Sequence, residues 1–484
     1  MRGDLSGENG MKRLLVCASA LMVGAPLAAQ SNVSDSDRAL AREIVTQAIA
    51  IRTAKGQGQV PKLADALIVR FRAAGFAPED IQTVPVVIDG ETTEGLLVRY
   101  AGAGRTVKKP IALLGHMDVV DAVAENWSVE PFKPVEKDGY LYGRGSSDNK
   151  AGVSILAATF IRLKTSGWVP DRDLVLALSG DEETGMRTTR ALTQHPWVRG
   201  AEFALNSDAG GGSMERSGAN PIFSIQSAEK TFATFLITAS NRGGHSSAPR
   251  PDNAIFDLAD AIKKIQAMRF PVQFNDITRE MVARTAAKRP GEAADSLNAL
   301  LANPTDTAAR ERIESYPDVS NILWTTCVPT MLKAGNAPNA LPQNAVATVN
   351  CRIFPGTTVA QVQAMIAGAI GNPSIKVVQD GEGVESPVSP PRADLFASLR
   401  RAVHANYPGA PVDVSMSSGG TDGREYRRAG IPSYGAGSLA MVRPDDSRAH
   451  GTDERLLLSS YDKELRYWDV LLKDLAGGPT RAVK

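Results

Sequence analysis

The stretch Ile111-Ala112-Leu113-Leu114-Gly115-His116-Met117-Asp118 joins an apolar run to a histidine and an aspartate that lie two residues apart. The apolar run predicts a buried strand, and an open α/β sheet forms its active site at the carboxyl ends of such strands. Because successive side chains of an extended segment alternate, His116 and Asp118 are expected to point the same way. A single pair of this kind is more often a solvated or capping pair than a metal site.

Four further segments with acidic or histidine side chains follow along the chain, and most of them also come after apolar runs. They are GRGSSDNK (residues 143–150), GDEETG (180–185), NSDAG (206–210) and RAHGT (448–452). Histidine nitrogen and carboxylate oxygen are ligands that zinc accepts, and two zinc ions a few ångströms apart need a bridging carboxylate. A hydrolase also needs a carboxylate that is not a ligand, to take a proton from water. Together the five segments predict a two-metal hydrolase site.

In this order the five segments resemble the dinuclear-zinc peptidase family of aminoacylase, glutamate carboxypeptidase, carnosinase and succinyl-diaminopimelate desuccinylase. The resemblance begins at about Asp35 and runs to the C-terminus, and the long polar stretch 270–321 is most like the Gly-X carboxypeptidase branch. It implies two Zn²⁺ ions per subunit, for which Co²⁺ or Mn²⁺ could substitute. Its implied metal ligands are His116 and Asp208 on one ion, Glu183 and His450 on the other, and Asp148 as the bridge.

The resemblance also implies roles for residues that do not bind metal. Glu182 would be the general base, Asp118 would hold the imidazole of His116, and His245 would bind the oxygen of the scissile carbonyl. A cis peptide bond is implied between Asp148 and Asn149. The implied substrate-binding residues are Arg352, Asn339, Gly419 and Gly420.

These roles imply a carboxypeptidase or an N-acyl-amino-acid amidohydrolase, in which a metal-bound hydroxide attacks the amide next to a C-terminal amino acid. Arg352 supports this direction of cleavage because its planar guanidinium matches a substrate carboxylate. The alternatives are a dipeptidase of the carnosinase kind, a deacylase, or a periplasmic binding protein without catalysis. The last of these predicts the loss of the base or of a ligand, and the sequence has all of them.

The expected fold is α/β, with a discontinuous catalytic domain at residues 30–226 and 387–484. Helices predicted at 37–51, 62–74, 151–165 and 188–192 alternate with apolar strands, which indicates a mostly parallel sheet flanked by helices. Residues 227–386 are predicted to form an inserted ferredoxin-like lid. Its expected βαββαβ order is strand 230–239, helix 253–268, strands near 323–332 and 345–353, helix 358–369 and strand 375–378.

The balance of 54 Lys and Arg against 53 Asp and Glu gives no global electrostatic field that favours binding of nucleic acid.

Residues 1–29 have the positive start, apolar run and small-residue end of a signal peptide, which predicts a periplasmic or secreted protein without a membrane span. Cys327 and Cys351 would then be the remaining cysteines, either joined across two strands or free. The lid could form a homodimer in which His245 reaches the partner's site, or each monomer could close its own lid.

Overall fold

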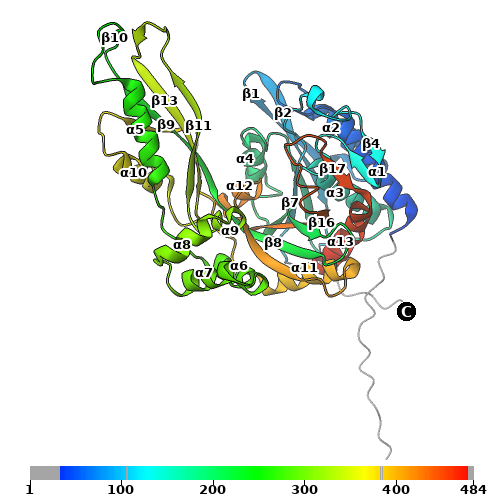
Figure 1. The fold of residues 1–484 in the computed structure, drawn as a ribbon. Coiled ribbons are helices and arrows are strands. Elements are labelled where there is room, and N and C mark those ends of the chain that lie inside the picture. The colour runs from blue at the N-terminus through cyan, green and yellow to red at the C-terminus, as the bar shows by residue number, and fades with distance from the viewer. Residues whose placement is uncertain (1–32, 105–106, 382, 384, 478–484) are drawn as a thin grey trace, which may run out of the picture. The chain divides into compact units, whose positions relative to one another are not determined.

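An eight-stranded mixed sheet contains His116 and Asp208 in its strands (Figure 1). The computed structural model describes residues 33–104, 107–381, 383 and 385–477. The strands lie in the order β1 (Ile81–Ile88), β2 (Glu91–Tyr100), β6 (Leu174–Ser179), β3 (Ile111–His116), β7 (Phe203–Met214), β16 (Ser433–Val442), β8 (Ile222–Glu229) and β15 (Val412–Ser417). The central neighbours β6, β3, β7 and β16 run parallel, whereas β1 and β2 pair antiparallel at one edge. The predicted α/β class with a mostly parallel centre is confirmed.

Helices cover both faces of this sheet, because the side chains on both faces of its central strands are apolar. In β3, Ile111 and Leu113 belong to one buried cluster and Ala112 and Leu114 to another. The first cluster contains side chains of α1 (Asp35–Ala50), α2 (Val60–Ala73), α3 (Lys150–Thr165), α11 (Ala393–Asn406) and α13 (Leu458–Ala476). The second contains side chains of α4 (Arg187–Gln194) and α12 (Gly423–Arg428). A sheet buried on both faces is thus fixed between two helical layers.

A second, four-stranded antiparallel sheet has the order β11 (Thr326–Ala334), β13 (Asn344–Ile353), β9 (Thr231–Ser240) and β14 (Lys376–Asp380). Helices α5 (Ala254–Ala267) and α10 (Val359–Ile370) pack against it, so the predicted βαββαβ order is present (Figure 1). A short ribbon of β10 (Gly244–His245) and β12 (Ala340–Leu341) was not predicted. The division of the chain into a catalytic domain and a lid stays a prediction.

The polar stretch 270–321 is helical, as expected, and forms α6 (Asp276–Lys288), α7 (Glu292–Ala302), α8 (Thr307–Glu314) and α9 (Pro317–Ser320). Helix α6 packs against β15, and Lys288 Nζ lies 3.2 Å from the Asp413 carboxylate on that strand. An edge strand exposes unpaired backbone groups, and α6 lies over this one. The excursion therefore protects an edge of the main sheet.

Cys327 and Cys351 face each other in the register of β11 and β13 and form a disulfide. This disulfide decides between the two alternatives that the sequence left open, joined or free cysteines.

The predicted signal peptide, residues 1–29, lies outside the described residues. Within the described ranges, no helix is both long and apolar enough to cross a bilayer. The remaining short elements are η1 (Pro78–Asp80), η2 (Ala124–Asn126), β4 (Val135–Lys137), β5 (Tyr140–Tyr142) and β17 (Arg455–Leu457).

Candidate active site

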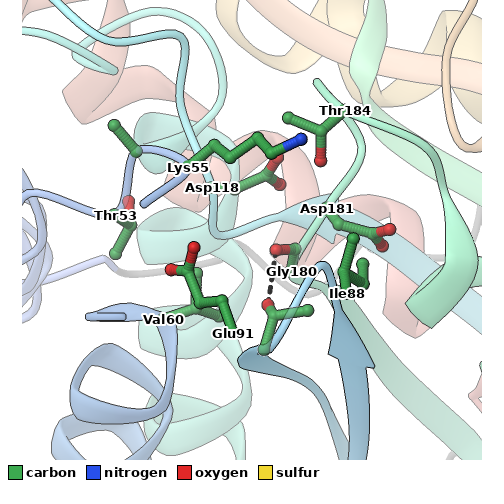
Figure 2. A pocket seen from close by; sticks show the side chains of 11 residues that line it. Thr53, Lys55, Val60, Ile88, Glu91, Asp118, Gly180, Asp181 and Thr184 are labelled. Carbon is green, nitrogen blue, oxygen red and sulfur yellow. Dashed lines mark hydrogen bonds between the residues drawn. The ribbon is translucent and has the colours of Figure 1, made fainter. Parts of the chain in front are cut away.

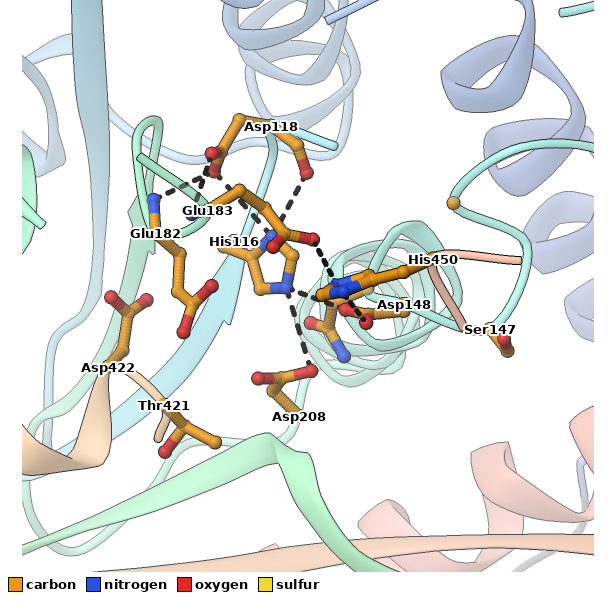
Figure 3. Close-up of polar contacts among 12 residues, drawn as sticks. His116, Asp118, Ser147, Asp148, Glu182, Glu183, Asp208, Thr421, Asp422 and His450 are labelled. Atoms are coloured by element: carbon orange, nitrogen blue, oxygen red, sulfur yellow. Dashed lines mark hydrogen bonds and ion pairs between the residues drawn. The ribbon is translucent and has the colours of Figure 1, made fainter. Parts of the chain in front are cut away.

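The five predicted metal ligands meet at the carboxyl edge of the parallel strands (Figure 3). His116 Nε2 lies 3.0 Å from one carboxylate oxygen of Asp148 and 3.6 Å from the carboxylate of Asp208. His450 Nε2 lies 3.3 Å from the other oxygen of Asp148 and 3.0 Å from Glu183 Oε1. Asp148 therefore contacts both histidines, as a bridging ligand must. The peptide bond that follows it, Asp148–Asn149, is cis, as predicted.

The donor atoms of this cluster suit divalent metal ions. Zinc–ligand distances near 2.0–2.2 Å put neighbouring donors of a tetrahedral site roughly 3.3 Å apart, close to the separations seen here. His116, Asp148 and Glu183 offer ligand atoms within 4.8 Å of one another. Hydrogen bonds that the His450 imidazole donates to the carboxylates of Asp148 and Glu183 raise the pKa of His450 to about 10. This strongly negative environment is one that bound cations would offset.

Asp118 positions the two glutamates more directly than it positions His116. Its carboxylate oxygens accept hydrogen bonds from the backbone N–H groups of Glu182 and Glu183, each at 3.0 Å. His116 Nδ1 lies 3.0 Å from the backbone carbonyl oxygen of Asp118, and 3.6 Å from its carboxylate. The sequence predicted support of the imidazole, and the closer support comes from the backbone of the same residue. One aspartate thus fixes the turn that carries Glu182 and Glu183.

The Glu182 side chain diverges from that of Glu183 and lies between Asp208 and Asp422 (Figure 3). Among the described residues, none donates a hydrogen bond to its carboxylate. Burial raises the pKa of Glu182 well above its ordinary value, and the charges of Asp208 and Asp422 raise it further. Burial also raises the pKa of Asp422 to about 7. A carboxylate next to the metal ligands, with no hydrogen-bond donor of its own, can exchange a proton with a reactant.

Glu454 holds the loop of the bridging ligand, and the sequence analysis missed it. Its fully buried carboxylate accepts hydrogen bonds from Arg144 Nη1 at 2.8 Å and from the backbone N–H groups of Gly145, Ser147 and Asp148 at 2.9, 2.8 and 3.0 Å. The Ser147 hydroxyl donates a further bond at 2.9 Å. The available sequence signal for Glu454 was its position four residues after His450. The residues that it contacts lie more than 300 positions earlier in the chain, so local spacing does not reveal them.

A cleft of about 570 Å³ lies beside Glu182 and Glu183 and reaches Arg352 and Gly420. It is large enough for an amino acid, whereas the cavity behind Asp118 in Figure 2, about 30 Å³, has room for little more than water. Gly419, next to Gly420, donates its N–H to Ser417 Oγ at 3.0 Å. The cleft also contains Arg424 of α12, a cation that was not among the predicted site residues.

A smaller cavity of about 80 Å³ lies next to the metal ligands and reaches away along β7 and β16. Asp208 and Ser147 line its inner end, and Leu439 and Met441 line its wall. Leu439 and Met441 share one face of β16 because they are two residues apart on a strand. The metal cluster therefore has a cleft with Arg352 and Arg424 at Glu182 and Glu183, and a second, smaller space at Asp208 that Leu439, Met441 and Arg443 line.

His245 and Asn339 lie together, away from Arg352. His245 pairs with Ala340 in the β10–β12 ribbon, and the backbone N–H of Ser246 donates to the Asn339 carbonyl at 3.0 Å. This ribbon follows the end of β9 at Ser240, opposite Asn344 of β13. Asn344 and Arg352 are eight residues apart on that strand, or about 26 Å at about 3.3 Å per residue. Within one chain, the structure therefore separates these predicted substrate-binding residues into two groups.

The other two histidines of the chain, His195 and His404, lie outside this site and have structural contacts. His195 Nε2 lies 2.9 Å from Gln82 Oε1, and His404 Nε2 lies 2.9 Å from the carbonyl oxygen of Ala410.

An open α/β sheet with histidines and carboxylates at its carboxyl edge, and an uncommitted glutamate beside them, is the architecture of a metal-dependent hydrolase. Residues 112–474 match the family model described as Peptidase family M20/M25/M40, and the chain belongs to this family of hydrolytic enzymes. The family resemblance predicted from the five segments is thus confirmed.

Similar proteins and a solved structure agree with the assignment to this peptidase family. The chain is 30% identical over 377 residues to human N-fatty-acyl-amino acid synthase/hydrolase PM20D1, covering 76% of this chain and 74% of that protein. It is 26% identical over 395 residues to Probable carboxypeptidase S-like 2 of Dictyostelium discoideum, covering 78% and 75%. The solved di-peptidase Dug1p from Saccharomyces cerevisiae has a TM-score of 0.66 at 19% identity, over 92% of this chain and 97% of that one. The structural likeness shows a common fold.

Proposed function

We propose that this hydrolase uses two zinc ions to remove the C-terminal amino acid from peptides or N-acyl amino acids. The observation that carries the proposal is a continuous series of five side chains, Asp208, His116, Asp148, His450 and Glu183, in which the facing nitrogen and oxygen atoms of successive members lie 3.0–3.6 Å apart, beside a glutamate that is not one of them. His116 and Asp208 would hold one ion, Glu183 and His450 the other, and Asp148 both. Ions bound there supply Lewis acids that polarise a carbonyl and acidify water.

The protein's own residues supply proton transfer and orientation. Glu182 takes a proton from the attacking water and returns it to the leaving nitrogen, because a single carboxylate can act first as base and then as acid. Asp118 keeps Glu182 and Glu183 in place through their backbone N–H groups. Arg352 binds the substrate carboxylate, helped by the backbone of Gly419 and Gly420.

The two spaces beside the metal cluster support this orientation of the substrate. The cleft that contains Arg352 suits an anionic amino acid. The cavity along Leu439 and Met441 suits an acyl group or the preceding residue of a peptide. A relative described as an N-fatty-acyl-amino acid synthase/hydrolase is in keeping with an acyl group on that side.

Hydrolysis of matched acids and amides tests the direction of cleavage. N-acyl amino acids should be cleaved at least about 100-fold faster than their C-terminal amides, since leaving a half-buried arginine without its anion costs about 3 kcal/mol or more. Arg352→Ala should lose most of this discrimination, whereas Lys333→Ala, an exposed change on the same sheet, should keep it. Equal wild-type rates on acid and amide would contradict the proposal. The same assay after metal removal and addition of Zn²⁺, Co²⁺ or Mn²⁺ tests the choice of metal.

The position of His245 and Asn339 supports a homodimer in which these residues reach the partner's active site. Their ribbon lies at the end of β13 that is about 26 Å along the strand from Arg352 of the same chain, too far for one substrate to span, so each would complete the site of the partner. Mixing inactive His245→Ala subunits with inactive Glu182→Ala subunits should then restore activity, because one site of each mixed dimer has both residues. An active enzyme that stays monomeric would contradict this arrangement.

A periplasmic or secreted location is part of the proposal. The Cys327–Cys351 disulfide supports it, since such bonds persist in oxidising compartments. Cell fractionation, with sequencing of the mature N-terminus, tests both this location and removal of residues 1–29.

A further inference from the structure

The cleft wall next to Arg352 carries more positive charge than one substrate carboxylate would offset. Arg352 stacks on Phe232, with its guanidinium carbon 4.9 Å from the ring centroid. Among the described residues, no carboxylate lies within ion-pair distance of it. Burial lowers the pKa of Arg352, and so does the charge of Arg424, which places the two guanidiniums within electrostatic reach of each other. Both line the same cleft.

Among the described residues, Arg424 forms an ion pair with one buried carboxylate, that of Glu425, and other arginines share it. Its Nη2 lies 3.2 Å from Glu425 Oε1, and Glu425 also pairs with Arg428 at 2.7 Å and with Arg190 at 3.6 Å. The Arg424 side chain is 12% exposed, so bulk solvent screens its charge little. The nearby buried Glu229 is held by Arg427. Arg352 and Arg424 together therefore present two cations to the cleft, with one shared carboxylate behind them.

We propose that this pair of arginines selects a leaving amino acid with an acidic side chain, aspartate or glutamate. Arg352 binds its α-carboxylate, and Arg424 binds the carboxylate of its side chain. A neutral amino acid would leave Arg424, which repels Arg352, with only its share of the Glu425 carboxylate, and this is less favourable than a further anion in the cleft. An acidic amino acid gives each cation a charge-assisted hydrogen bond. This inference rests on the proposed function, of which it specifies the substrate.

Pairs of substrates that differ only in charge test the inference. Glutamate and glutamine, or aspartate and asparagine, are nearly equal in size, so their N-acyl derivatives separate charge from shape. With the acyl group constant, as acetyl and again as dodecanoyl, kcat/KM should be about 10- to 100-fold higher for the acid, as expected for one charge-assisted hydrogen bond. Arg424→Gln should reduce the glutamate-to-glutamine ratio to near one, and Arg424→Lys should restore part of it.

Arg428→Gln is the matched control. Arg428 pairs with the same Glu425, but its side chain is 37% exposed and it does not line the cleft, so its removal should leave the ratio unchanged. Thermal unfolding of each variant shows that it is folded. Calorimetric binding of the free amino acids measures the selection without catalysis. L-glutamate should bind more tightly than L-glutamine to the wild type, and the two should bind with equal affinity to Arg424→Gln.

The outcomes separate this inference from the proposed function. Efficient cleavage of N-acyl-leucine with no preference for glutamate over glutamine would refute the role of Arg424 and leave the carboxypeptidase proposal intact. Tighter binding of glutamate than of glutamine, without cleavage of any N-acyl amino acid, would refute the proposed reaction and support the charge selection. An unchanged ratio in Arg424→Gln would also refute the inference.

Discussion

Replacing Glu454 by glutamine should weaken both the fold and the metal site. The amide oxygen could still accept from the backbone N–H groups of Ser147 and Asp148, now 2.8 and 3.0 Å from the carboxylate. The amide nitrogen would face Arg144 Nη1 and the N–H of Gly145, which now donate to Glu454 Oε2 at 2.8 and 2.9 Å. Because an amide nitrogen donates and does not accept, both of these hydrogen bonds would be lost. Losing two hydrogen bonds to a buried charge, at about 1.5–3 kcal/mol each, gives a loss of roughly 3 to 6 kcal/mol.

Urea unfolding and metal titration measure the two effects. The free energy of unfolding should fall by that amount, and zinc affinity should fall because Asp148, the bridging ligand, depends on the same loop. Asp453→Asn is the control, since its exposed carboxylate accepts only from the backbone and hydroxyl of Ser128, and its effect should stay below about 1 kcal/mol. A stable Glu454→Gln variant with wild-type zinc affinity would refute the assignment of Glu454 as the support of this loop.

Three further predictions test the base, a buried acid and the disulfide. Glu182→Ala should keep its metal content but lose most turnover, whereas Glu183→Ala should lose metal; elemental analysis with activity assays checks this, and equal metal loss would show that the two roles are assigned wrongly. Burial raises the pKa of Glu464 from 4.5 to about 7, so the folded state retains a proton that the unfolded state releases, and stability should fall as pH rises from about 4.5 to 7. Urea unfolding at pH 5 and pH 7.5 should show this fall in the wild type and less of it in Glu464→Gln; an identical pH dependence would contradict the shift. Thiol titration of unfolded, unreduced protein should find Cys327 and Cys351 unreactive, and two free thiols there would exclude the disulfide.

Local patterns in the sequence predicted the sheet centre and the ligand set. The apolar runs before His116 and Asp208 are short and continuous, as in strands that are buried on both faces, and both residues lie near the carboxyl edge of the sheet. The βαββαβ order could also be predicted, because its helices and strands differ in apolar period. The edge pair β1 and β2, the long helix α13 and the β10–β12 ribbon were not predicted. The ribbon is too short to show any period.

The sequence by itself determined which chemistry the chain can perform. The family resemblance of its five segments implied the five ligands and, in Glu182, a base. Only the tertiary structure decided which distant residues support that chemistry: Glu454 under the loop of Asp148, Arg424 beside Arg352, and His245 and Asn339 far from both. The physical reason is that spacing along the chain determines the direction of a side chain within its own helix or strand, whereas contacts across hundreds of residues depend on how those elements pack.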